Sequence, residues 1–127
     1  MPPRTAEPTP AELPLLQALW RLRQATGAEV RAALPGSPPA YTTVMTLLGR
    51  LEAKGLVKVD KAREPFVYRP RASEAAVVRG KVKRLVDTLF GGSAEALVLR
   101  LVEEEALSEE DLKRIEARLA ARKEGRR

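Results

Sequence analysis

The sequence has neither cysteine nor histidine among its 127 residues. Without them the chain cannot form disulfides, bind a metal through thiolate or imidazole, or use a cysteine nucleophile or a Ser-His-Asp triad. Only carboxylate and lysine chemistry would remain for catalysis, and the acidic runs at 103–105 and 109–111 are typical of a solvated helix face and of a helix's first turn. We therefore expect a protein that is not an enzyme and holds no metal or cofactor.

Long apolar runs are also missing. The longest apolar stretch, 94–99, already contains Glu95, whereas a helix needs about 20 apolar residues to cross a bilayer. The N-terminus does not have the cationic-then-apolar order of a signal peptide. We expect a soluble, cytoplasmic protein with no membrane partner.

The charge that is present is unevenly distributed. Apolar residues make up 44% of the chain and charged residues 31%, a balance typical of a globular protein. A length of 127 residues suits one compact domain, or one small domain with an appended helical piece. The net charge is +6, with 15 basic and 7 acidic groups in residues 1–84 (+8) against 8 and 10 in residues 85–127 (−2). The first part of the chain is therefore the part suited to bind a polyanion.

Capping signals mark the first two helices. Residues 1–8 contain three prolines and no apolar periodicity, which predicts a flexible N-terminal arm. Thr9 and Glu12 form a predicted capping box ahead of a helix that runs to about residue 24, and Thr26 and Glu29 form a second box ahead of a shorter one. The proline-rich stretch 35–39 ends that second helix.

A third helix is predicted over 40–54. Its apolar positions lie on one face at i, i+3, i+4 and i+7: Val44, Leu47, Leu48 and Leu51. The opposite face carries small, hydroxylated and basic residues. A hairpin follows, with strands 56–59 and 65–69 around a charged turn, and Pro65 predicts that the return strand lies at an edge. Helices are then predicted over 73–90, from 93 and from 108.

Three helices followed by a two-stranded ribbon is the order of a winged helix-turn-helix, whose third helix enters the DNA major groove while the ribbon contacts the flanking backbone. The fold class is therefore predicted to be mostly α with a small β-hairpin: a winged helix over 9–72 followed by a helical dimerisation region over 73–127. Arginine can bind guanine or a phosphate, and threonine offers a hydroxyl to phosphate and a methyl to thymine. The candidate DNA-binding residues are Thr42, Thr43, Thr46, Arg50, Lys54, Lys58, Lys61, Arg63 and Arg69.

Residues 73–127 are too few to bury the apolar core that a stable independent unit needs. The segment 97–102 is apolar on more than one helical face, which predicts that a second copy of the chain covers it. The candidate dimerisation residues are Val82, Leu85, Leu89, Leu97, Val98, Leu101, Val102, Leu112, Ile115 and Leu119.

Three segments carry a family resemblance: Thr9 to Glu12 with Leu19-Trp20, the stretch 43–55 (TVMTLLGRLEAKG), and 66–70 (FVYRP). Together they resemble the penicillinase and copper-responsive repressors of the BlaI/MecI/CopY type, over about residues 9–120. The resemblance implies a homodimeric transcriptional repressor that reads a palindromic operator in double-stranded DNA, with Thr43, Thr46 and Arg50 in the recognition-helix motif. A winged-helix adaptor that binds another protein, without sequence-specific DNA binding, is the alternative, because a fold does not fix a function.

Overall fold

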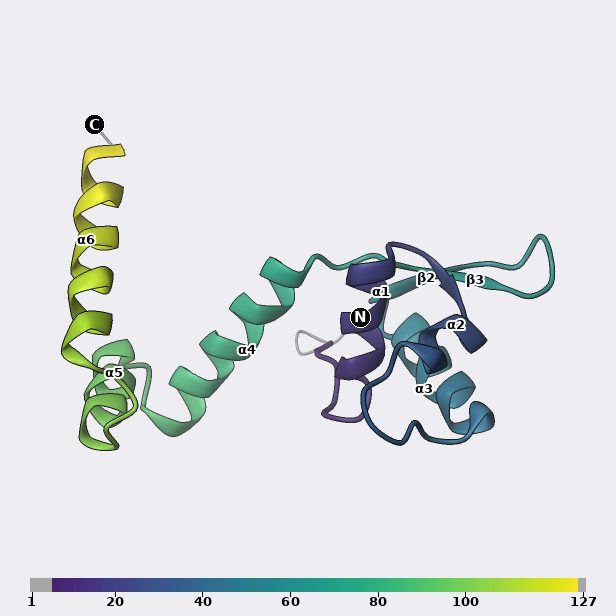
Figure 1. Cartoon of the computed structure of the whole chain (residues 1–127), viewed down its shortest axis with the longest axis horizontal. Coiled ribbons are helices and arrows are strands. Elements are labelled where there is room, and N and C mark those ends of the chain that lie inside the picture. The colour runs from purple at the N-terminus through teal and green to yellow at the C-terminus, as the bar shows by residue number, and fades with distance from the viewer. Residues whose placement is uncertain (1–5, 126–127) are drawn as a thin grey trace. The chain divides into compact units, whose positions relative to one another are not determined.

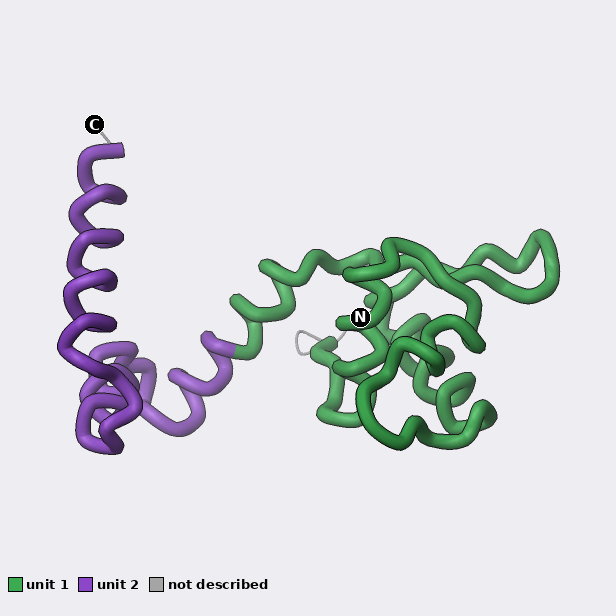
Figure 2. Tube along the Cα trace, in the orientation of Figure 1, with its two compact units in different colours: residues 1–81 green, residues 82–127 purple. Residues whose placement is uncertain are grey.

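The computed structural model describes residues 6–125, which form two compact units (Figure 2). One unit ends at Lys81 and is called the head here; the other begins at Val82 and is called the tail unit. The elements, in chain order, are α1 (Leu13–Leu22), β1 (Ala25–Thr26), α2 (Gly27–Ala32), α3 (Tyr41–Ala53), β2 (Val57–Asp60), β3 (Val67–Pro70), α4 (Glu74–Leu89), α5 (Ala94–Glu103) and α6 (Glu109–Gly125) (Figure 1). This confirms the predicted fold class, a winged helix-turn-helix with further helices after it.

Both predicted capping boxes are present. The Thr9 N–H donates to Glu12 Oε1 at 3.0 Å and the Glu12 N–H donates to Thr9 Oγ1 at 3.2 Å. The pair forms a turn just before α1, so the helix begins three residues later than a box at its N-terminus would place it. Thr26 and Glu29 make the same reciprocal bonds, at 2.8 and 3.2 Å, and cap α2 directly. These local bonds satisfy backbone donors that a helix start would otherwise leave unpaired.

The sheet has three strands where the sequence predicted two. Ala25 and Thr26 form β1, which pairs antiparallel with β3, and the strand order is β1-β3-β2. The return strand of the hairpin is therefore central, and its predicted place at an edge is wrong. Pro65 does not prevent this, because β3 begins two residues after it and the ladder needs no N–H from that position.

The core of the head forms where α1, α2, α3 and the sheet meet. Its fully buried side chains include Leu16 and Leu19 of α1, Val30 of α2 and Leu48 of α3, each with 0% of its surface exposed. Val77 of α4 joins the same cluster, which extends the head beyond the predicted boundary at residue 72. Trp20 packs against the core, and its indole Nε1 donates to the Ala72 carbonyl at 2.9 Å.

The tail unit contains the rest of α4 together with α5 and α6. Ser93 caps α5, and Ser108 and Asp111 cap α6 by reciprocal bonds of 3.0 and 2.9 Å, as the sequence predicts. Between residues 82 and 125, Val86 is the only buried hydrophobic residue. The three helices of this unit therefore leave most of their apolar side chains at the surface.

The predicted N-terminal arm is only partly described. Residues 1–5 of it, and residues 126–127 of the predicted dimerisation region, lie outside the described residues. The carbonyls of Glu7 and Pro8 accept hydrogen bonds from Lys54 and Lys81, so for these two residues the prediction of a flexible arm is corrected. Within residues 6–125 no helix is long and apolar enough to cross a membrane.

Candidate nucleic-acid interface

Helix α3 has one buried and one exposed face, as its sequence predicts. Val44, Leu47, Leu48 and Leu51 are buried against the head. The opposite positions are exposed and constitute what we call the recognition face: Thr42, Thr43, Thr46, Gly49 and Arg50. The Thr46 hydroxyl donates to the Thr42 carbonyl at 3.0 Å, so its oxygen remains able to accept a further bond. The face is therefore small, polar and cationic, with no bulky side chain to prevent close approach.

Two arginines and a glycine position this helix. Arg31 Nε donates to the Pro39 carbonyl at 2.7 Å, and Arg21 donates to the Ala33 carbonyl at 3.1 Å, which ties down the connection between α2 and α3. A Cβ at Gly27 would lie 2.5 Å from the Met45 sulfur, so a larger residue there would require the Met45 side chain to shift. The recognition face is thus carried by a helix that the head holds at both its start and its buried side.

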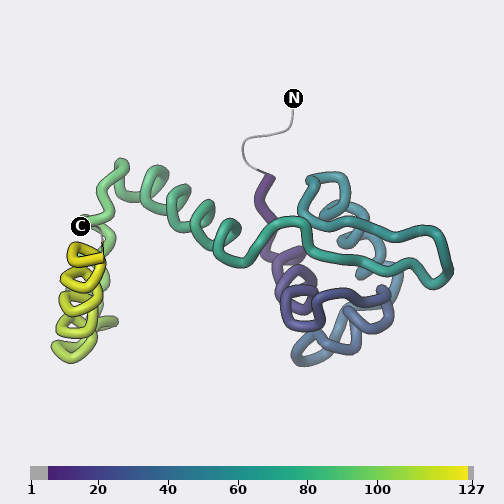
Figure 3. Tube along the Cα trace, turned by 90° about the horizontal axis from the view of Figure 1, so that it is seen from above, coloured from purple at the N-terminus to yellow at the C-terminus, as the bar shows by residue number. Residues whose placement is uncertain are grey.

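The hairpin of β2 and β3 extends away from the helices of the head (Figure 3). Three of the predicted DNA-binding residues meet on it, because Lys58, Lys61 and Arg69 line one groove of about 300 Å³ together with Val59 and Asp60. We call it the wing groove. Arg63 is exposed in the turn of the hairpin and does not line the groove.

Neighbouring side chains fix two of these cations. Lys61 lies 3.6 Å from Glu52 Oε2, which links the hairpin turn to the last turns of α3. Arg69 Nε donates to Gln24 Oε1 at 2.9 Å, and the residue as a whole remains exposed. These contacts connect the wing groove to the last turns of α3 and to the segment before β1.

Lys54, also predicted to bind DNA, makes an internal contact in the folded head. Its Nζ lies 2.5 Å from Glu12 Oε1 and 3.0 Å from the Glu7 carbonyl, and its side chain is only 27% exposed. The Glu12 carboxylate is 1% exposed. Burial by itself would raise the pKa of Glu12, but the hydrogen bonds from Lys54 and Thr9, with the charges of Lys54 and Arg50, hold that pKa below its ordinary value. The ammonium is thus committed to an internal ion pair.

Two residues that adjoin or contact the predicted site residues are missing from the predicted set. Tyr41 directly precedes Thr42 at the start of α3 and exposes 48% of its surface. Gln24, which holds Arg69, lies in the short connection between α1 and β1. An aromatic residue directly before two threonines was a usable signal for Tyr41, whereas the partner of Arg69 is 45 residues away and leaves no local signal.

The apolar residues of the tail unit form a second candidate surface. Eight large hydrophobic side chains from it are exposed: Val82, Leu85, Leu89, Val98, Leu99, Val102, Ile115 and Leu119. Leu97, Leu101 and Leu112, also predicted for dimerisation, are half-buried. Single exposed leucines are common on protein surfaces. Eight exposed large hydrophobic residues, against one buried hydrophobic residue between residues 82 and 125, indicate a surface that the chain itself leaves uncovered.

Comparison with known proteins identifies a family that matches most of the chain. The chain matches the family described as penicillinase repressor over residues 8–121. The penicillinase repressor of Bacillus licheniformis is 27% identical over 103 residues, which span 80% of this chain and 80% of that protein. The methicillin resistance regulatory protein MecI of Staphylococcus aureus strain N315 is 26% identical over 116 residues, 88% of this chain and 92% of that protein. A solved structure of a MarR family protein from Bacillus stearothermophilus is 26% identical, with a TM-score of 0.45 over 77% of this chain and 74% of that one.

Proposed function

Because the chain belongs to the penicillinase repressor family, we propose that it represses transcription as a homodimer whose two heads read an inverted repeat in double-stranded DNA. The family makes it a DNA-binding transcriptional repressor. Its symmetry, its operator and the residues that contact DNA are inferred below from the geometry of this chain.

The recognition face of α3 is the observation that carries the proposal. Its backbone is supported by four buried side chains, while Thr43, Thr46 and Arg50 are exposed on the other side. An arginine on such a helix can bind O6 and N7 of guanine together, and a threonine can accept or donate to a base edge or a phosphate and contact the thymine methyl. We assign these residues and Thr42 to the major groove.

The wing groove supplies contacts of another kind. Lys58, Lys61 and Arg69 place three cations around one hollow, and Arg63 adds a fourth at the turn. Contacts of cations with phosphates fix the position of a protein on the duplex and release condensed counterions, but they carry no sequence information directly. We assign these four residues to the DNA backbone and leave Lys54 out, since its ammonium is already paired with Glu12.

The tail unit carries the surface that we assign to binding a second copy of the chain. A single chain leaves Leu89, Leu99 and Leu119 between 52% and 69% exposed, and burial of apolar surface contributes about 25 cal/mol per Å². A symmetric partner that presents the same helices covers these side chains with like chemistry on both sides. Two heads joined in this way bind two half-sites about one helical turn, or a multiple of it, apart.

Selection of bound duplexes from a random DNA library by the full-length protein tests the proposal. The expected result is an inverted repeat, because a two-fold dimer presents identical heads to both half-sites. A single asymmetric motif would contradict the dimeric arrangement. Weak binding without any enriched sequence is the outcome that a protein-binding adaptor predicts, and it would contradict the proposal altogether.

A further inference from the structure

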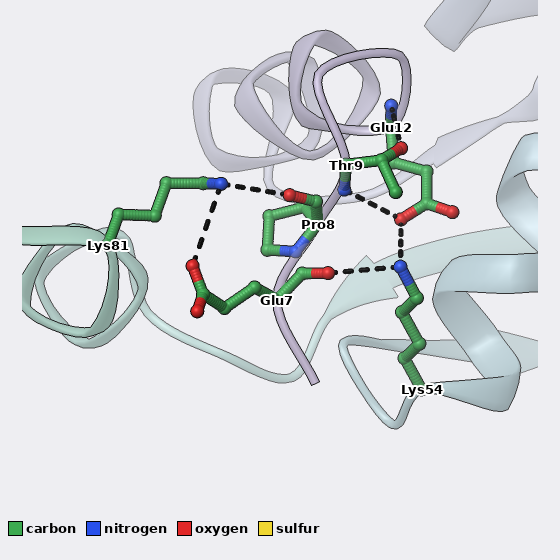
Figure 4. A network of polar contacts seen from close by, with 6 residues as sticks. All are labelled: Glu7, Pro8, Thr9, Glu12, Lys54 and Lys81. Carbon is green, nitrogen blue, oxygen red and sulfur yellow. Dashed lines mark hydrogen bonds and ion pairs between the residues drawn. The ribbon is translucent and has the colours of Figure 1, made fainter. Parts of the chain in front are cut away.

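The segment over residues 7–12, which we call the N-terminal strap, lies between the end of α3 and the middle of α4 (Figure 4). On one side Lys54 binds the Glu7 carbonyl and the Glu12 carboxylate, at 3.0 and 2.5 Å. On the other side Lys81 Nζ donates to the Pro8 carbonyl at 2.9 Å and lies 3.8 Å from Glu7 Oε1. One short piece of chain thus joins two lysines from different helices of the head.

The strap is fixed more firmly than a surface loop. Pro8 is buried, the Glu12 side chain is 1% exposed, and the Lys81 side chain is 36% exposed. The Thr9 N–H also donates to Glu12 at 3.0 Å. Charge-assisted bonds to backbone carbonyls at such partly buried places are stronger than those between neutral groups. Lys81 therefore binds to a firmly held part of the head.

Two further contacts attach α4 to the head, one just before its first residue and one in its first turn. Trp20 Nε1 donates to the Ala72 carbonyl at 2.9 Å, and Val77 packs in the core with 8% of its surface exposed. Lys81 lies four residues after Val77, on the same face of the helix. Both of these contacts lie near the start of α4, so the contact of Lys81 one turn further along is the one that opposes a tilt of the rest of the helix.

We propose that the N-terminal strap, through Lys81, fixes the direction in which α4 leaves the head and so sets the spacing between the two DNA-reading heads of the dimer. The inference rests on the proposed function, because only a dimer has two heads to space. In it Lys81 is a positioning residue, which acts on DNA binding without touching DNA.

The dimensions of α4 explain why one attachment matters. The helix has 16 residues and is about 24 Å long at 1.5 Å per residue. A tilt of about 10° at its start moves its far end by about 4 Å, more than the roughly 3.4 Å that separates successive base pairs. Joined heads gain affinity only where the geometry lets both bind at once. Loss of the strap contact should therefore make the dimer tolerant of wrong spacings and weaker at the right one.

The test compares Lys81→Met with Lys83→Met in the full chain. Both remove one positive charge from α4, but Lys83 is exposed and pairs with Asp87 one turn along the same helix, at 2.8 Å. The probes are the duplex selected by the wild-type protein, the same duplex with one base pair added between half-sites, and a duplex with a single half-site. The wild type and Lys83→Met should prefer the selected spacing by at least about tenfold, and Lys81→Met should reduce that preference by at least about threefold with unchanged half-site affinity.

Equal loss on the half-site and on the whole operator would overturn the inference, because it would make Lys81 an ordinary DNA contact. An unchanged preference in Lys81→Met would overturn it too. If the wild type itself shows no preference between one and two half-sites, the dimeric function fails instead, and the two failures are thereby distinguished.

A measurement without DNA gives an independent answer. The chain has no cysteine, so spin labels can be placed on two introduced cysteines at the exposed positions Gln17 of α1 and Thr88 of α4. With labelled chains diluted into unlabelled ones, pulsed electron paramagnetic resonance should give a narrow distance distribution for the wild type and a broader one for Lys81→Met. Lys81→Arg, which keeps the charge and the donors, should restore the narrow one; equal widths in all three would refute the strap's role.

Discussion

Replacing Glu12 with alanine should destabilise the head by about 3 kcal/mol. The substitution removes a carboxylate that is 1% exposed, lies 2.5 Å from Lys54 Nζ, and accepts from the Thr9 N–H. Loss of one member of a buried ion pair costs about 3–5 kcal/mol because the other charge is left without its partner. We expect a loss at the lower end of this range, because Lys54 is 27% exposed and keeps its bond to the Glu7 carbonyl.

The chain contains its own control for this experiment. Glu29 closes the same kind of capping box with Thr26, with bonds of 2.8 and 3.2 Å, but it is exposed. Glu29→Ala therefore removes only a cap, at a cost of about 1 kcal/mol. Urea unfolding followed by the fluorescence of Trp20, the single tryptophan of the chain, reports on the head. Equal losses in both variants would refute the reasoning that assigns the larger effect to the buried ion pair.

The same pair predicts a pH dependence with a definite sign. The pKa of Glu12 is lower in the folded head than its ordinary value of 4.5. Its stabilisation is therefore fully present above pH 4.5 and is lost as the pH falls through the lower, folded pKa. The difference in unfolding free energy between wild type and Glu12→Ala should be constant at neutral pH and shrink below pH 4.5. A difference that grows on acidification would contradict the assignment.

Three further predictions concern DNA binding and assembly. The logarithm of the DNA association constant should fall with the logarithm of salt concentration with a slope steeper than about −2, because several phosphates are neutralised at once; a shallower slope in a salt titration would leave too few contacts for this interface. In gel-shift titrations Arg50→Ala and Thr46→Ala should each weaken operator binding by about 1–3 kcal/mol and relax its sequence preference. Lys61→Ala should instead weaken binding to all DNA sequences alike. A sequence-selective effect of Lys61→Ala would contradict its assignment to the DNA backbone. Leu119 is 56% exposed in the single chain, so Leu119→Glu should leave the chain folded. It should shift sedimentation from dimer to monomer, because the carboxylate would be buried at the dimer interface without a partner. An unchanged dimer would exclude Leu119 from the interface.

The parts of the fold that the sequence predicts are those determined by neighbours along the chain. Both capping boxes span three residues, and the buried stripe of α3 repeats within two turns, so local bonding and periodicity are sufficient to identify them. The pairing of β1 with β3 was missed, because two residues are too few to show alternation and β3 lies about 40 residues away. The hairpin's return strand consequently received the wrong place in the sheet.

The same limit applies to the candidate site, whose DNA-binding residues remain a prediction. The recognition face follows from its position opposite the stripe of Val44 and Leu48, and the structure exposes it as expected. Lys54 looked like one more cation at the end of the same helix. Its partner Glu12 is 42 residues away, and only the folded chain shows that the two charges meet. Charge along the sequence therefore does not distinguish an exposed lysine from one held in an internal ion pair.

The most direct test of the central claim is to repeat the DNA selection with the Arg50→Ala variant and compare its enriched motif with that of the wild type. If two identical heads read DNA through α3, the wild-type motif is an inverted repeat, and the variant loses sequence preference at equivalent positions in both half-sites while the remaining positions are kept. An unchanged motif would show that this face of α3 does not read the bases. Loss of preference in only one half would show that the two heads are not equivalent.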